Sequence, residues 1–127
     1  MVQNKALDSF EKTLHFKACC RNKNLGPDCM KLCDFGLTRQ EAERMTRNNR
    51  CLEQNLQAFF GCLSNGKNNI ACCTDRKIFQ EKRHRVCQPF CHPTGHNWSM
   101  NRTEAEKFRV CKSLSHEIAY CHMAYYF

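Results

Sequence analysis

Residues 19–33 read CCRNKNLGPDCMKLC: an adjacent pair of cysteines, eight intervening residues, and a C-x-x-x-C couple. Two more widely spaced cysteines follow before residue 63. The same order returns in residues 72–91, CCTDRKIFQEKRHRVCQPFC, which two spaced cysteines again follow. The two halves of the chain therefore carry one six-cysteine pattern twice, with different gap lengths.

Twelve cysteines in 127 residues are typical of a disulfide scaffold. A repeat of about fifty residues buries little apolar surface, so cross-links are expected to stabilise each half. The even number of cysteines in each half predicts that each repeat closes its own bridges, and several pairings remain open. We expect an N-terminal helix plus the first repeat in residues 1–66 and the second repeat in residues 67–127. The predicted disulfide cysteines are Cys19, Cys20, Cys29, Cys33, Cys51, Cys62, Cys72, Cys73, Cys87, Cys91, Cys111 and Cys121.

The cysteine content also predicts the compartment. Disulfides persist in oxidising surroundings, so we expect a secreted protein or the extracellular domain of a membrane protein. Two acceptor sequences for N-glycosylation fit secretion and place Asn97 and Asn101 in a surface loop. The first residues contain no apolar run of signal-peptide length, and no later stretch resembles a membrane span. We therefore expect a mature protein or an excised domain, without membrane insertion.

Helical periodicity dominates the chain, and no stretch alternates polar and apolar residues as a strand would. Residues 5–18 form the first amphipathic pattern, with Leu7, Phe10, Leu14 and Ala18 at helical spacing. This helix delivers the cysteine pair, whose side chains point about 100° apart and can tie one helix to two elements. We predict an all-α, disulfide-rich fold of two tandem six-cysteine helical repeats packed as one small domain.

Capping and breaking residues place the other helices. The signals are an N-cap at Asp28, capping boxes at residues 38–41 and 103–106, an apolar stripe in residues 50–63, and Pro89. Since an α-helix tolerates proline only in its first turn, the helix around Pro89 should begin near Val86 or Cys87. The other predicted helices cover residues 29–35, residues 38–47, residues 50–63, and the segment from the second capping box to Cys121.

The cysteines and histidines also raise the question of a metal site. Zinc modules use C-x-x-C knuckles, whereas this chain has only C-x-x-x-C. His92 and His122 each follow a cysteine, without further ligands at metal spacing. The His-Asp that follows the cysteine pair of secreted phospholipases is missing here, and a thiol enzyme would need an unpaired cysteine. We predict no catalytic, cofactor-binding or metal-binding residues, and a protein that is not an enzyme.

The formal net charge of +8 is the remaining signal. A basic patch is predicted between the second cysteine pair and Cys87, made of Arg76, Lys77, Lys82, Arg83 and Arg85. On a secreted module it could bind heparan sulfate, an acidic protein or anionic lipid, although a solvated helix face has the same composition. Nucleic acid is a poor candidate, because the oxidising compartment argues against it and no groove-reading motif is present.

The order of the twelve cysteines resembles the nematode DB module, an extracellular module in which all cysteines are expected to be paired. Residues 16–20 and 69–73, FKACC and NIACC, are supporting local matches. Each half is also similar to the six-cysteine helical repeats of the reversion-inducing cysteine-rich protein with Kazal motifs. A more distant likeness is to the helical co-receptor domains for glial-derived neurotrophic factors. These resemblances imply a disulfide-linked helical bundle used for protein recognition, and they supply no functional residue beyond the cysteines.

We therefore expect a non-enzymatic module that binds a protein ligand or receptor through the basic segment 76–85 or the loop over residues 92–103. Two alternatives stay open. The apolar stripes in residues 52–63 and 114–118 could line a cavity for a small hydrophobic ligand, although such stripes are more often core. The basic patch, through Lys82, Arg83 and Arg85, could instead hold a glycosaminoglycan.

Overall fold

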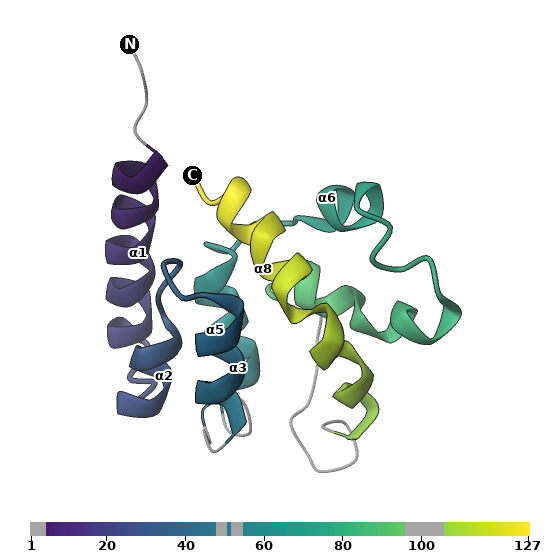
Figure 1. Cartoon of the computed structure of the whole chain (residues 1–127), viewed down its shortest axis with the longest axis horizontal. Coiled ribbons are helices and arrows are strands. Elements are labelled where there is room, and N and C mark those ends of the chain that lie inside the picture. Colours follow the sequence, from purple (N-terminus) through teal and green to yellow (C-terminus); the bar gives the residue numbers. More distant parts are fainter. Residues whose placement is uncertain (1–4, 48–50, 52–54, 96–105) are drawn as a thin grey trace.

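The structure is a computed structural model that describes residues 5–47, 51, 55–95 and 106–127 (Figure 1). These residues form the helices α1 (Lys5–Asn22), α2 (Pro27–Leu32), α3 (Arg39–Arg47), α5 (Leu56–Leu63), α6 (Ile70–Asp75) and α8 (Ser115–Ala124), with the 3₁₀-helices η1 (Lys82–Cys91) and η2 (Arg109–Leu114). Figure 1 shows α1 and α2 at one side of the molecule and α6 at the other, with α5 and α8 between them. Within the described ranges no strand occurs, which confirms the predicted all-α class.

All twelve cysteines lie in described positions, and all are paired. The bridges of the first half are Cys19–Cys62, Cys20–Cys33 and Cys29–Cys51. The bridges of the second half are Cys72–Cys121, Cys73–Cys91 and Cys87–Cys111. Counted within each half, the first cysteine pairs with the sixth, the second with the fourth, and the third with the fifth. Each doublet thus ties one helix to two other elements, and both halves share one connectivity.

The first helix buries a face different from its predicted apolar stripe. Phe16 and Cys20 are buried, whereas Phe10 and Leu14 are 59% and 54% exposed. The cysteine pair causes this difference, because the bridges of Cys19 to α5 and of Cys20 to the end of α2 set the rotation of the helix. Phe16 lies one turn before Cys20 on the same side, while Phe10 and Leu14 lie roughly 120–160° away.

The two capping predictions in the first half had different outcomes. Thr38 and Glu41 form the predicted capping box: the N–H of Glu41 donates to Thr38 Oγ1 at 3.1 Å, and the N–H of Thr38 donates to Glu41 Oε1 at 3.2 Å. The prediction of Asp28 as an N-cap was wrong, because α2 begins earlier, with Gly26 as N-cap and Pro27 after it. Proline suits that position, since an N–H in the first turn has no partner within the helix.

Two predicted helices are divided in the structure. In the segment 50–63, Cys51 is helical and α5 begins only at Leu56, because Asn55 has a non-helical φ of −129°. Asparagine favours such positions, since its side chain competes with helical hydrogen bonds. The final predicted helix separates into η2 and α8. Residues 52–54 and most of the second capping box lie outside the described residues.

The segment around Pro89 is a 3₁₀-helix, and the prediction that it begins near Val86 or Cys87 was wrong. It begins at Lys82 and contains Pro89 within it. The predicted restriction belongs to the α-helix, where the proline ring meets the carbonyl four residues earlier. A 3₁₀-helix has three residues per turn, so His84, Cys87 and Phe90 fall on one face, and all three are buried.

The two halves share one hydrophobic core. A chain of aromatic contacts crosses between them: the ring of Phe59 lies 5.7 Å from Phe16 and 5.5 Å from Phe60, whose ring is 4.8 Å from Phe90. Phe90 in turn contacts Phe108 at 5.2 Å. This continuous core agrees with two repeats packed as one domain, while the boundary between residues 66 and 67 stays a prediction.

The C-terminal segment closes the contact between the halves. Tyr126 is 0% exposed, and its hydroxyl is hydrogen-bonded to His15 Nδ1 on α1 at 2.8 Å. Its ring contacts Phe35 at 5.3 Å, and its carbonyl accepts a 2.8 Å hydrogen bond from Asn65 Nδ2. Burial raises the pKa of Tyr126 to about 12. This residue therefore joins the end of the second repeat to three places in the first.

Replacing Tyr126 should show how much this contact contributes to the free energy of unfolding. Tyr126→Ala removes a buried ring and leaves a cavity, so the free energy of unfolding should fall by about 3–5 kcal/mol. Tyr125 next to it is 59% exposed, and Tyr125→Ala should change the free energy by less than about 0.5 kcal/mol. Denaturant unfolding of the oxidised proteins, followed by circular dichroism, measures both. Equal effects of the two substitutions would contradict the packing of Tyr126.

A buried histidine connects the elements of the second half. His122 is 0% exposed; Asn69 Nδ2 donates to its Nδ1 at 2.8 Å, and its Nε2 donates to the carbonyl of Phe90 at 2.7 Å. The carbonyl can only accept, so the proton lies on Nε2 and the ring is neutral. Burial lowers the pKa of His122 to about 4, although the hydrogen bond to Phe90 opposes that shift.

The depressed pKa of His122 predicts a loss of stability in mild acid. The unfolded chain takes up a proton near pH 6.5, whereas folded His122 does so only near pH 4. Its contribution is therefore complete above pH 6.5 and declines by about 3 kcal/mol as the pH falls to 4. Calorimetric Tm values between pH 7 and 4 should show this decline in the wild type, and less of it in His122→Gln. The exposed His116 of the same helix provides the control, since His116→Gln should keep the wild-type profile.

Candidate functional site

The cations of the predicted basic patch differ in the partners that they contact. Arg76 is bound by Glu117 of α8, with Arg76 Nε donating to Glu117 Oε2 at 2.8 Å. Its guanidinium also lies over the ring of Tyr120, 4.2 Å from the centroid. An ion pair and a cation–π contact together hold Arg76 against α8. The residue therefore joins α6 to α8 and contributes little free positive charge.

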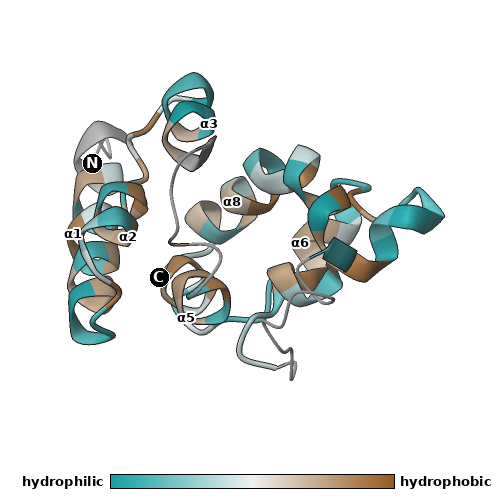
Figure 2. Cartoon of the chain, turned by 90° about the horizontal axis from the view of Figure 1, so that it is seen from below, coloured by the Kyte–Doolittle hydropathy of each residue, from teal (hydrophilic) through white to brown (hydrophobic). Residues whose placement is uncertain are grey.

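Three of the other four cations, Lys82, Arg83 and Arg85, lie on η1. Arg83 Nε lies 2.7 Å from Glu81 Oε2 in an exposed ion pair. Lys82 and Arg85 are three residues apart in a 3₁₀-helix, so they project from one exposed ridge. Lys77 lies before this helix with a φ of 59°. Figure 2 shows the beginning of η1 at the edge of the molecule as hydrophilic ribbon. Among the described residues, Lys77, Lys82 and Arg85 have no acidic partner.

The second predicted surface is described only in part. Residues 92–95 begin the loop, and Pro93 within it is buried. The carbonyl of Pro93 accepts a hydrogen bond from Gln57 Nε2 at 3.3 Å, which attaches the loop to α5. Asn97 and Asn101, the predicted glycosylation sites, lie outside the described residues.

No metal site is apparent in the described part of the chain, where no three His, Cys, Asp or Glu side chains come together as ligands. His122 uses both ring nitrogens in hydrogen bonds, and the cysteines are all in disulfides. Among the helices that the structure describes, none is long and apolar enough to cross a membrane.

The exposed side of α1 is a surface that the sequence alone does not reveal. Phe10, Leu14 and Ala18 project from it at four-residue spacing, and all three are exposed. All three belong to the apolar stripe that the helical periodicity predicts. The signal that could have revealed their exposure is Phe16, because it lies one turn before Cys20 and competes with that pattern for the buried side.

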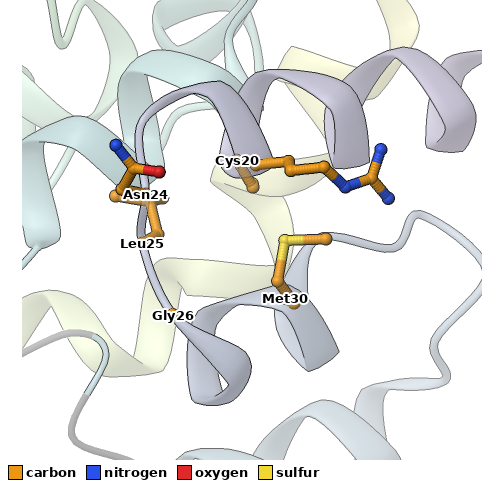
Figure 3. Close-up of a pocket in the computed structure, with 6 residues that line it drawn as sticks. Cys20, Asn24, Leu25, Gly26 and Met30 are labelled. Atoms are coloured by element: carbon orange, nitrogen blue, oxygen red, sulfur yellow. The ribbon is translucent and has the colours of Figure 1, made fainter.

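A pocket of about 360 Å³ lies where the exposed side of α1 meets α2. Its lining is Cys20, Arg21, Asn24, Leu25, Gly26 and Met30. Figure 3 shows the thioether of Met30 directed from α2 toward the end of α1 that carries Cys20. The turn between the two helices has positive φ at Asn24 (54°) and Gly26 (88°), which brings the helices close together. The pocket is shallow and open to solvent.

The stripes considered for a lipid cavity are largely core. Leu56, Phe59, Leu63 and Ile118 are buried among other core residues, and Leu114 packs against them. Leu52 lies outside the described residues.

Comparison with known proteins agrees with this architecture. The sequence model of the DB module family matches residues 19–122, a range that contains all twelve cysteines. No curated protein and no solved structure matched the chain. The match covers most of the 127 residues, and the six disulfides fit a DB module. The protein therefore belongs to the DB module family of extracellular, cysteine-rich modules.

Proposed function

We propose that this chain is a non-enzymatic protein-interaction module that binds a protein ligand or receptor through the exposed side of α1. The observation that supports this proposal is the exposure of Phe10 and Leu14 on a helix that two disulfides hold in place. Burial of a Phe or Leu side chain is worth about 1.5–3 kcal/mol. The two side chains can therefore contribute substantial free energy when a partner covers them.

The rigidity of α1 adds to this argument. Cys19 joins the helix to α5, and Cys20 joins it to the end of α2. Lys12 Nζ donates to the carbonyl of Met123 at 2.9 Å, and Thr13 Oγ1 accepts from the N–H of Phe35 at 3.0 Å. A preorganised surface loses little conformational entropy on binding, so more of the contact energy appears as affinity.

The range that the DB family model matches bears on the exposed side of α1. The DB model begins at residue 19, whereas Phe10 and Leu14 lie before it. The cysteine framework is thus shared with the family, whereas Phe10 and Leu14 lie outside the matched range. Such a division suits a module in which a common scaffold carries individual recognition surfaces.

Replacing the two apolar side chains tests the proposal. A partner is first identified by cross-linking the labelled protein to cell surfaces or extracellular fluid, followed by mass spectrometry. The variant Phe10→Ser with Leu14→Ser should weaken binding of that partner at least tenfold, with a Tm within a few degrees of the wild type. Tyr125→Ser is the matched control, because Tyr125 is as exposed as Phe10 at 59%. Undiminished binding by the double variant would refute the assignment to α1.

The exposed ridge of η1 favours a second function, binding of heparan sulfate. Lys82 and Arg85 point the same way, and Lys77 precedes them without an acidic partner in the described chain. On a heparin column, Lys82→Ala with Arg85→Ala should elute at clearly lower salt than the wild type, because ion pairing with sulfates is lost. Lys23→Ala with Lys31→Ala removes the same charge from exposed positions in the first half. Equal shifts by both pairs would mean that only net charge matters, which contradicts a specific ridge.

A further inference from the structure

The exposed side of α1 continues into the pocket at its end. Phe10, Leu14, Ala18 and Arg21 lie four, four and three residues apart, so they follow one line along the helix. At 1.5 Å per residue this line is about 16 Å long. Arg21 also lines the pocket between α1 and α2. The apolar residues and the pocket are therefore parts of one surface, which we call the α1 face.

The pocket provides a place for one apolar side chain. Its apolar lining comes from Met30 and Leu25, and the bridge partner Cys20 forms part of the wall. A methionine side chain is flexible and polarisable, so it adapts to the shape of an inserted group. A volume of about 360 Å³ accommodates a leucine or phenylalanine side chain.

Charge is unevenly distributed along the α1 face. Arg21 and Lys23 are exposed near the pocket, and Lys17 is half-buried one turn earlier. None of these three cations has an acidic partner among the described residues. Glu11 lies near the other end of the face, almost three turns from Arg21. A partner with carboxylates at the pocket end would satisfy these cations, and the net charge of +8 would attract it.

We infer that the α1 face binds an acidic amphipathic helix of a partner protein, with one apolar side chain in the pocket and carboxylates against Lys17 and Arg21. This inference rests on the proposed function and adds the chemistry of the partner. The helix would lie along Phe10, Leu14 and Ala18, as amphipathic helices lie in apolar grooves. Arg21 suits a carboxylate because its guanidinium can donate two parallel hydrogen bonds.

Two other occupants fit the charges less well. A second copy of the chain would bring another charge of +8 to the same place, which opposes self-association. A membrane-bound helix carries cations along its whole polar face, whereas Lys12 beside Glu11 is directed to the carbonyl of Met123, and Lys17 and Arg21 lie nearer the pocket. An acidic protein segment matches both the apolar line and the position of the charge.

A peptide library tests the inference directly. Yeast cells display sixteen-residue helical peptides in which apolar, acidic, basic and neutral residues vary at each position. Peptides are selected on the wild-type protein and counter-selected against Leu14→Glu. We expect the selected peptides to carry Leu or Phe at helical spacing, with Asp or Glu near the residue that occupies the pocket. Basic or neutral peptides, or no Leu14-dependent binders, would overturn the inference.

Charge-reversal variants then test whether the carboxylates of a selected peptide contact Arg21. By fluorescence anisotropy, Arg21→Glu should weaken a selected peptide at least tenfold, and Lys112→Glu on η2 should leave its affinity within twofold. The same peptide with its carboxylates replaced by lysines should bind Arg21→Glu better than it binds the wild type. Equal effects of the two substitutions, or no recovery with the basic peptide, would contradict the contact with Arg21.

Two control measurements assign the face to the other occupants if the inference is wrong. Binding to vesicles of phosphatidylcholine and phosphatidylserine that Leu14→Glu abolishes would assign it to a membrane. A dimer in sedimentation that Leu14→Glu dissociates would assign it to a second copy. If the natural partner requires Phe10 and Leu14 but tolerates Arg21→Glu, the proposed function stands and only the acidic helix is refuted. If the partner tolerates all these changes, the proposed function fails as well.

Discussion

Adjacent cysteines at the end of a helix impose the constraint on which the rest of the structure depends. Two neighbouring side chains, about 100° apart, are bonded to two different elements, so the helix can neither slide nor rotate. Cys19 and Cys20 hold α1 in this way, and Cys72 and Cys73 hold α6. Each bridge contributes roughly 2–4 kcal/mol by restricting the unfolded chain. For repeats with so few core residues, these bridges can determine which faces are buried.

The orientation of α1 follows from that constraint. In a protein held only by its core, Phe10 and Leu14 would be expected to point inward, because their burial would stabilise the fold. Here the bonded cysteines place Phe16 on the buried side and leave the other two side chains in solvent. The fold tolerates this loss of hydrophobic energy because its cross-links stabilise it independently. An apolar surface can then remain available to a partner.

The sequence predicted the helical class, the repeat, the capping box of α3 and the double attachment made by each cysteine pair, because each has a local signal. It could not predict the pairing, which depends on which cysteines the folded chain brings together. It also assigned the wrong face to α1, since two apolar patterns overlap there and only the bridges choose between them. The 3₁₀ geometry of η1 was missed for a similar reason: Pro89 argues against an α-helix, but the burial of His84 follows from three residues per turn. In the basic segment, the ion pair of Arg76 with Glu117 could not be predicted, because Glu117 lies far away in the sequence.

The two repeats share their bridges but differ in the length of one helix. Both halves have the same connectivity, so the bridges alone do not distinguish them. They differ in the helix that carries the cysteine pair, which has 18 residues in the first half and 6 in the second. The four turns that α1 extends before Cys19 are unnecessary for the pattern, since the second half closes its bridges without them. In this segment Phe16 packs in the core and His15 is hydrogen-bonded to Tyr126, whereas Phe10 and Leu14 stay in solvent, where the proposed partner would cover them.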